Sequence, residues 1–170
     1  SFLIAMVLSA FIGWANGWFV TRVKISSFLV TLGMLLVVRG VGLYITDGFP
    51  QRTWSAGGHW LASALVGDFY IGSFRVYASL FWFVGIAIIL GYVLTGTKVG
   101  NWIQAAGGNA NSARARGVNV NRTKVALFML TAVLSGFSGI ISSIRTSSAN
   151  PNSGTGYELE VIAMVVIGGT

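Results

Sequence analysis

The chain has 170 residues, of which 54% are hydrophobic and only 9% are charged. Soluble domains carry roughly 25% charged residues. This chain has too few charged residues to cover a surface that faces water, so lipid must form part of its solvent. The net charge of +7 is compatible with nucleic-acid binding, but the basic residues lie between apolar runs, where the charge bias of membrane-protein loops explains them better.

Four apolar runs are long enough to cross a membrane as helices, because a hydrocarbon core of about 30 Å needs about 20 apolar residues in helical form. Only helices or closed barrels satisfy backbone groups in lipid, and these runs are too long and too apolar for barrel strands. We therefore predict an all-α, polytopic transmembrane helix bundle. The expected spans are 2–20, 25–45, 76–94 and 125–144, with a partial fifth from residue 161 onward.

The two ends of the chain predict a fragment. The chain opens on Ser1 without an initiating methionine, and it ends on Thr170 inside an apolar stretch. We expect a single transmembrane domain over 1–170 that is incomplete at both ends. Half a bundle exposes its helix-packing faces, so we expect the fragment to fold poorly alone.

The charged residues between the spans predict one orientation. The side that holds the turn at 22–24 and the loop at 98–124 carries seven Lys or Arg and no acid, whereas the other side carries three Arg and all four acids. Cytoplasmic loops are enriched in Lys and Arg, so we expect the 98–124 loop to be cytoplasmic. The basic side holds Arg22, Lys24, Lys98, Arg114, Arg116, Arg122 and Lys124, and the other side holds Arg52, Arg75, Arg145, Asp47, Asp68, Glu158 and Glu160.

Small residues recur every four positions inside two of the spans. Gly13 and Gly17 form one such pair, and Ser135, Gly139 and Ser143 form a stripe in the fourth span. Stripes of this kind let helix backbones approach closely in lipid. We interpret both as packing faces within the bundle, with a hinge or a dimer seam as the alternative.

The 98–124 loop contains the pattern of a short, capped helix. Asn109, Asn111 and Ser112 are good N-cap residues, and Gly117 is a natural stop at the C′ position. The segment between them is rich in Ala and ends in two arginines, which favour the carbonyl end of a helix dipole. The pattern fits either a plain surface loop or a docking element for a cytosolic partner.

Five segments of the chain, in order, form a more specific pattern. It resembles the ribose-type sugar ABC permeases, and the resemblance covers most of the chain, weakening across 47–95. The segments are Asn16-Gly17, then 28–33 (FLVTLG) with Arg39-Gly40, then Gly107-Gly108-Asn109 with Ala113-Arg114 and 117–120 (GVNV), then Ser135-Gly136 with Gly139, and finally 154–163 (GTGYELEVIA) leading to 166–170 (VIGGT).

The resemblance implies a role for the short helix. In this family the segment is the coupling helix that sits in a groove of the cytosolic ABC ATPase, so Asn109, Ala113, Arg114 and Gly117 would be the docking residues. Family members often carry an acidic pair where this chain has 110–112 (ANS), so an acidic contact to the ATPase is not assumed for this chain.

The resemblance also implies an assembly. It comprises a periplasmic sugar-binding protein, two permease subunits forming a homo- or heterodimer, and the partner ATPases, all at the bacterial inner membrane. This chain would be the permease that passes the sugar through the bilayer. The sequence does not name the sugar.

Polar residues within or beside the spans are candidates for the translocation path or its gate: Asn16, Thr31, Arg39, Glu158 and Glu160. Buried charges in a membrane are costly and mark functional sites. The competing interpretation gives Arg39 a snorkelling or ion-pair role, and gives the two glutamates a role at the start of a helix, where carboxylates are favoured.

No catalytic, metal or cofactor site is expected. The chain has no cysteine and one histidine, His59, so thiol chemistry, disulfides and ordinary metal spacings are absent from it. The segment 91–98 (GYVLTGTK) approaches a P-loop, but Lys and Thr are exchanged and the glycines lie at the end of a span. We expect ATP to be bound by the partner subunit, and this chain to be a transport subunit and no enzyme.

Two further functions stay open. A permease of the branched-chain amino-acid importers shares the general helical plan. A channel or membrane scaffold without an ATPase would need no docking helix, so its activity would survive deletion of 109–117.

Overall fold

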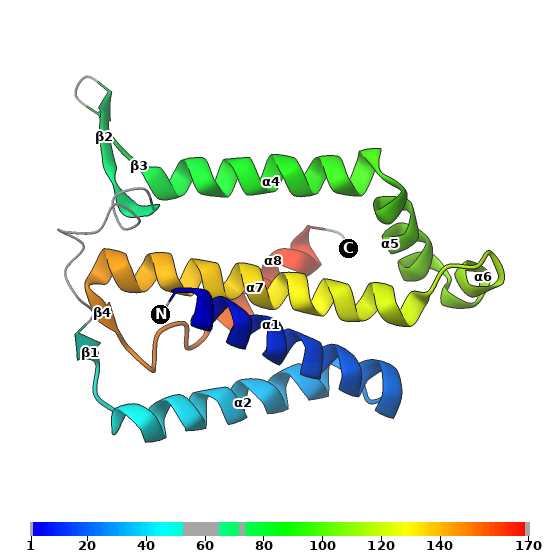
Figure 1. Ribbon diagram of the computed structural model, residues 1–170, viewed down its shortest axis with the longest axis horizontal. Coiled ribbons are helices and arrows are strands. Elements are labelled where there is room, and N and C mark those ends of the chain that lie inside the picture. Colours follow the sequence, from blue (N-terminus) through cyan, green and yellow to red (C-terminus); the bar gives the residue numbers. More distant parts are fainter. Residues whose placement is uncertain (1, 53–64, 72–73, 169–170) are drawn as a thin grey trace.

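The computed structural model describes residues 2–52, 65–71 and 74–168 and consists mainly of helices (Figure 1). His59 and the central part of the 47–75 loop, at 53–64 and 72–73, lie outside the described residues. Of 68–71 and 74–76, only the backbone is described.

Four helices are long and apolar enough to cross a membrane. This confirms the predicted all-α, polytopic bundle with four spans. The fourth span begins five residues earlier than expected because the Asn119 side chain caps it, accepting a hydrogen bond from the Arg122 N–H at 3.1 Å. The four are α1 (Phe2–Trp18) with its π-helical continuation η1 (Phe19–Val23), α2 (Ser27–Thr46), α4 (Ala78–Gly96) and α7 (Val120–Thr146).

Shorter elements join the spans. The segment between α4 and α7 folds into two helices, α5 (Lys98–Gly108) and α6 (Ala110–Ala115), and the chain closes with α8 (Tyr157–Ile167). Two antiparallel ribbons were not expected from the sequence. They pair β1 (Gln51–Arg52) with β4 (Ser148–Ala149), and β2 (Asp68–Ile71) with β3 (Phe74–Tyr77).

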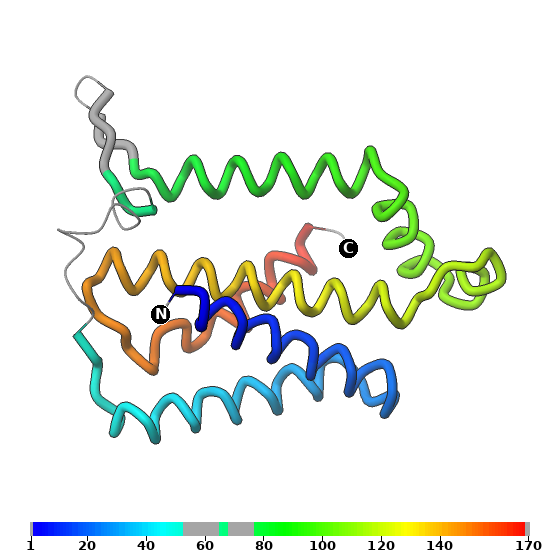
Figure 2. Tube along the Cα trace, viewed as in Figure 1, coloured from blue at the N-terminus to red at the C-terminus, as the bar shows by residue number. Residues whose placement is uncertain are grey.

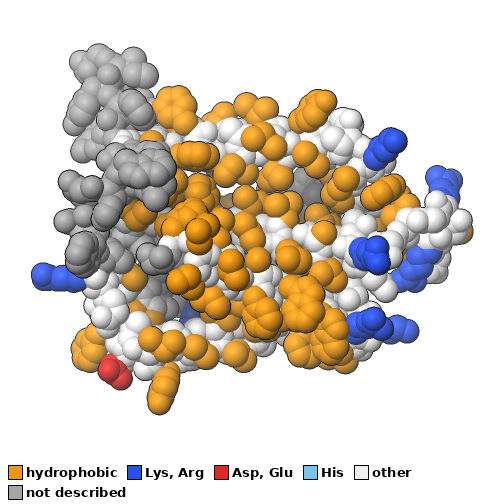
Figure 3. Space-filling model, viewed as in Figure 1, with side chains coloured by type: hydrophobic (Ala, Val, Ile, Leu, Met, Phe, Trp, Pro, Cys, Tyr) orange, Lys and Arg blue, Asp and Glu red, His pale blue; other side chains and the backbone are white. Residues whose placement is uncertain are grey.

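The long helices alternate in direction between two ends of the molecule. Figure 1 shows the α1–α2 turn, α5, α6 and the start of α7 at one end, and both ribbons at the other. Lys and Arg side chains gather at the first end, while hydrophobic side chains cover the length of the helices (Figure 3). We call the first end the basic end; it carries the seven Lys and Arg residues that the sequence analysis assigns to one side.

The closest helix pair is α1 with α7. A Cβ atom added at Gly13 would lie 2.5 Å from the Phe128 carbonyl oxygen and 2.7 Å from the Met129 Cα. One added at Gly17 would lie 2.8 Å from the Val125 Cα. Only glycine lets the two backbones approach so closely, and such contacts associate helices in lipid. The predicted packing role of Gly13 and Gly17 is confirmed.

The second small-residue stripe lies elsewhere on α7. Ser135 and Gly139 are exposed, and nothing among the described residues comes within 4 Å of a Cβ added at Gly139. In this part of α7 the glycine that faces α1 is Gly136, where an added Cβ atom would collide with the Ser9 side chain. At Ser135 and Gly139 the predicted packing role is therefore not seen within the described part of the chain.

Helix α4 stands further from α7 than α1 does, and aromatic side chains of α4 and of Tyr77, the last residue of β3, contact α7. The Trp82 and Phe137 rings meet edge to face at 5.8 Å between centroids, and the Arg145 guanidinium lies 4.5 Å from the centre of the Tyr77 ring. An apolar cavity of about 400 Å³ lies between the two helices. The structure is thus tight between α1 and α7 and loose around α4.

We predict that Gly13→Ala destabilises the protein while Gly91→Ala does not. The added methyl group at Gly13 overpacks the contact, which typically lowers the free energy of unfolding by about 1–3 kcal/mol. Among the described residues nothing lies within 4 Å of a Cβ atom added at Gly91, and Ala is the better helix former. Thermal unfolding of both full-length variants in detergent measures this. Equal stability of the two variants would show that the backbones do not approach as described.

Candidate functional site

The short helix α6 is capped at its start by Asn109. The Asn109 side-chain oxygen accepts hydrogen bonds from the backbone N–H groups of Asn111 and Ser112, at 3.0 and 3.1 Å. Of the three candidate N-caps, the structure thus selects the first. Asn109 also ends α5, so the chain turns from one helix to the next at a single residue.

The end of α6 is closed by a Schellman motif. The Val118 N–H donates to the Ala113 carbonyl at 3.0 Å, and the Gly117 N–H donates to the Arg114 carbonyl at 2.9 Å. Gly117 has φ = 82°, the left-handed conformation that this motif requires. The predicted short, capped helix is confirmed, with both ends satisfied by the residues that the sequence indicates.

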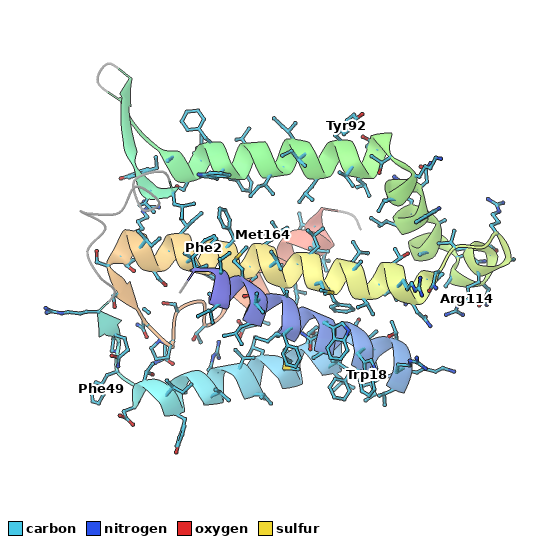
Figure 4. The ribbon with its side chains drawn as sticks, viewed as in Figure 1. Phe2, Trp18, Phe49, Tyr92, Arg114 and Met164 are labelled. Carbon is cyan, nitrogen blue, oxygen red and sulfur yellow. The ribbon has the colours of Figure 1, made fainter. Side chains whose placement is uncertain are left out.

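The start of α7 holds α6 in place. Ala113 and Val120 are 2% and 1% exposed, the lowest values among the described hydrophobic residues. Ala113 is therefore buried and helps to hold α6 against its neighbours. Of the four residues predicted to dock, Asn109, Arg114 and Gly117 are exposed. Figure 4 shows Arg114 at the basic end, beside the start of α7.

The corner between α4 and α5 is rigid, and the sequence analysis did not single it out. The Thr97 hydroxyl donates to the Val93 carbonyl at 2.6 Å and accepts from the Gly100 N–H at 3.3 Å. Gly100 is buried, and a Cβ atom there would collide with the Leu94 carbonyl. Thr97 is thus the N-cap of α5, and Gly100 is the residue whose N–H donates to it. A threonine directly before a helix is a common N-cap, so this corner could have been predicted from the sequence.

The candidate path residues lie on three helices, α1, α2 and α8. Asn16 lies on α1, and its amide oxygen is buried without a hydrogen-bond partner among the described residues. The Thr31 hydroxyl donates to the Ser27 carbonyl of its own helix at 2.9 Å. Arg39 is half-buried in α2. Of the three, Asn16 has the unsatisfied polar atom, which normally finds a partner.

The two glutamates occupy the first turn of α8. A Glu158 carboxylate oxygen accepts a hydrogen bond from the Gly156 N–H at 3.1 Å, which supports the helix-start interpretation, and Glu160 is exposed. Figure 2 shows α8 beginning level with the middle of α7, not at its end. The glutamates therefore lie deeper along the bundle axis than the sequence suggested.

Comparison with known proteins places the chain in a family. All of residues 1–170 match the family described as branched-chain amino acid transport system / permease component. The chain belongs to this permease family. Together with its four candidate membrane spans, this membership makes it part of a multi-pass membrane transport protein.

Curated relatives of this permease chain are named for sugars. It is 40% identical over 167 residues to the ribose import permease protein RbsC of Escherichia coli K12, covering 98% of this chain and 51% of that protein. It is 34% identical over 158 residues to the L-arabinose transport system permease protein AraH of the same strain, covering 91% and 45%. RbsC of Bacillus subtilis 168 is 34% identical over 155 residues, covering 91% and 47%. The chain spans about half the length of the curated relatives it matches. No solved structure matched it.

We predict that Asn109→Ala loosens α6 while Asn109→Asp leaves it intact. Alanine removes the side-chain oxygen that caps two N–H groups, a loss of about 1 kcal/mol, whereas aspartate retains it. Hydrogen–deuterium exchange of a peptide covering 109–118 in the full-length permease should be about fivefold faster in the alanine variant. Equal exchange in all three proteins would mean that the cap does not hold α6.

Proposed function

We propose that this chain is part of the membrane-spanning subunit of a bacterial ABC importer and carries a sugar across the inner membrane. The observation that carries the proposal is its 40% identity to a ribose import permease across 98% of its length. The second sugar relative, for L-arabinose, supports the class of substrate. The relatives differ in their named sugar, so the proposal extends to a sugar and not to one compound.

The proposed docking element for the partner ATPases is α6. Both of its ends are capped within the chain, so it is a preformed rigid body and loses little conformational entropy on binding. Arg114 and Arg116 are exposed on it, and no acid is present between 98 and 124. A docking groove that fits this surface carries negative charge or accepts hydrogen bonds in pairs from guanidinium groups.

A displacement of α6 would be transmitted directly to the membrane-spanning helices α7 and α1. Ala113 and Val120 bury the junction of α6 and α7, and α7 packs on α1 at Gly13 and Gly17. When ATP closes the partner ATPases, a shift of α6 moves this helix pair and changes the populations of outward- and inward-open states. The energy for that shift comes from the ATPases.

The opposite end of the molecule would face the periplasm. Charge asymmetry supports this orientation, because the basic end carries seven Lys or Arg without an acid. There a sugar-binding protein would deliver its ligand near the β1–β4 ribbon. The largely exposed apolar faces of α2, α4 and α8 would meet lipid, the remainder of the permease and a second permease subunit.

Within the span, Asn16 is the strongest candidate for the sugar path. A buried amide oxygen without a partner costs free energy, and a sugar hydroxyl or another polar group of the complete assembly would satisfy it. Thr31 already uses its hydroxyl as a donor within α2. Arg39, Glu158 and Glu160 would serve at the gate.

The chain would bind no nucleotide or other cofactor. Gly91 and Gly96 lie inside α4 and Lys98 begins α5, whereas a P-loop joins a strand to a helix. ATP would therefore be bound and hydrolysed by the partner subunit.

A branched-chain amino acid importer is the second candidate, because the matching family is described by that substrate. Reconstitution distinguishes the two, since each importer responds to its own loaded binding protein. A channel without an ATPase would respond to neither.

We predict that Arg114→Glu abolishes substrate-stimulated ATP hydrolysis while Lys98→Glu retains most of it. Both changes reverse a charge at the basic end, but only Arg114 lies on α6. The full-length permease, reconstituted with its neighbouring ATPase and binding protein, is assayed with and without sugar. Loss of at least tenfold corresponds to about 1.4 kcal/mol of lost docking or coupling.

If both variants hydrolyse ATP as the wild type does, α6 is not the coupling element. If the ATPase does not associate with the wild type at all, the channel interpretation takes precedence.

A further inference from the structure

A cavity of about 860 Å³ opens at the basic end, between the α1–α2 turn and the first turns of α7. The turn is short: η1 ends at Val23, Lys24 adopts a left-handed conformation with φ = 57°, and α2 starts at Ser27. This brings residues that are far apart in the sequence to one opening. The lining residues are Val20, Thr21, Lys24, Ile25, Ser26, Ser27, Arg114, Asn121, Lys124, Leu127, Phe128 and Thr131.

The outer part of the cavity is cationic. Lys24 comes from the α1–α2 turn, Arg114 from α6 and Lys124 from α7, so three separate segments each contribute one cation. No acidic side chain of the described residues lines the cavity. The hydroxyl groups of Ser26 and Ser27 and the Asn121 amide add hydrogen-bond donors beside the cations. This combination suits a phosphate group.

The inner part of the cavity is apolar. Leu127 and Phe128 lie about one helical turn beyond Lys124, within the span of α7, and Val20 and Ile25 face the same space. A soluble anion would leave these side chains uncovered. A ligand with a charged head and a hydrocarbon tail fits both parts of the cavity, and a phospholipid has this form.

We propose that this cavity binds an anionic phospholipid, with its phosphate group at Lys24 and Lys124 and an acyl chain along Leu127 and Phe128. Basic pockets between helices on the cytoplasmic side recognise anionic head groups in this way. The choice of leaflet rests on the proposed orientation, but binding itself depends only on the cavity. Because Arg114 also lines the cavity, bound lipid would hold α6 near α7 and support the docking element.

The test measures phosphatidylglycerol bound to the full-length permease in mixed micelles with phosphatidylethanolamine of the same acyl chains. Native mass spectrometry counts the bound lipids. The variants are Lys24→Gln, Lys124→Gln and their combination, with Lys98→Gln as matched control, because Lys98 does not line the cavity. Arg114 is kept unchanged because it belongs to the proposed docking surface.

We expect wild type and Lys98→Gln to prefer phosphatidylglycerol equally. Each cavity variant should bind it about fivefold more weakly, and the double variant about thirtyfold, which corresponds to about 1 kcal/mol for each cation near the lipid surface. The double variant Lys24→Arg, Lys124→Arg keeps the charge and should retain the lipid. If the glutamine variants do not fold, lipid binding by this double arginine variant is the measurement that tests the proposal.

Equal lipid binding by wild type, the Lys24→Gln, Lys124→Gln variant and the control would overturn the proposal. Displacement of the lipid by millimolar inorganic phosphate would also overturn it, because the site would then serve a soluble anion. The assay contains neither ATPase nor binding protein, so its failure is separate from failure of the proposed import function.

Discussion

The close contact between α1 and α7 is the constraint on which the rest of the structure depends. In lipid no hydrophobic effect drives helices together, so association depends on packing and on small residues that let backbones meet. Gly13 and Gly17 provide that approach against Phe128, Met129 and Val125. The contact fixes the depth of α1 relative to α7, and it thereby places the α1–α2 turn beside the first turns of α7. The cationic cavity and the position of α6 both follow from this register.

The remaining connections differ in stiffness, and the differences have functional meaning. From α4 to α7 the chain passes through two capped corners, at Thr97 and Asn109, and a Schellman motif at Gly117. These connections are short and held by hydrogen bonds, so α7 and α1 must move when α6 is displaced. Helices α2 and α4 have no comparable close contact among the described residues, since nothing lies within 4 Å of a Cβ atom added at Gly33, Gly40 or Gly42 of α2, or at Gly85 or Gly91 of α4. In the proposed importer, the tightly packed pair would move as one body, and the exposed faces would slide against lipid or other subunits.

Much of the fold could be predicted from sequence because membrane spans and helix caps are local signals. The expected span at 25–45 lies within two residues of α2, Ser27–Thr46, and Asn109 with Gly117 correctly marked α6. The start of α7 was missed because Arg122 and Lys124 were interpreted as loop residues, although long cationic side chains reach water from a helix.

Pairings between distant segments could not be predicted. No single stretch of sequence indicates the β1–β4 pairing, or that Lys24 and Lys124 line the same cavity. The role of Gly136 in place of Gly139 depends on how α7 is rotated about its axis.

The most direct test of the account measures which end of the bundle faces the cytoplasm. Figure 4 places Phe49 and Arg114 at opposite ends, and this chain has no cysteine. Single cysteines at Phe49 and at Asn111, in a full-length permease without other cysteines, can be labelled with a membrane-impermeant maleimide. The proposed orientation predicts labelling of Phe49→Cys in cells with a permeabilised outer membrane, and labelling of Asn111→Cys only in inverted inner-membrane vesicles. The reverse pattern would place α6 on the outside, where no ATPase could reach it, and would contradict the proposed coupling.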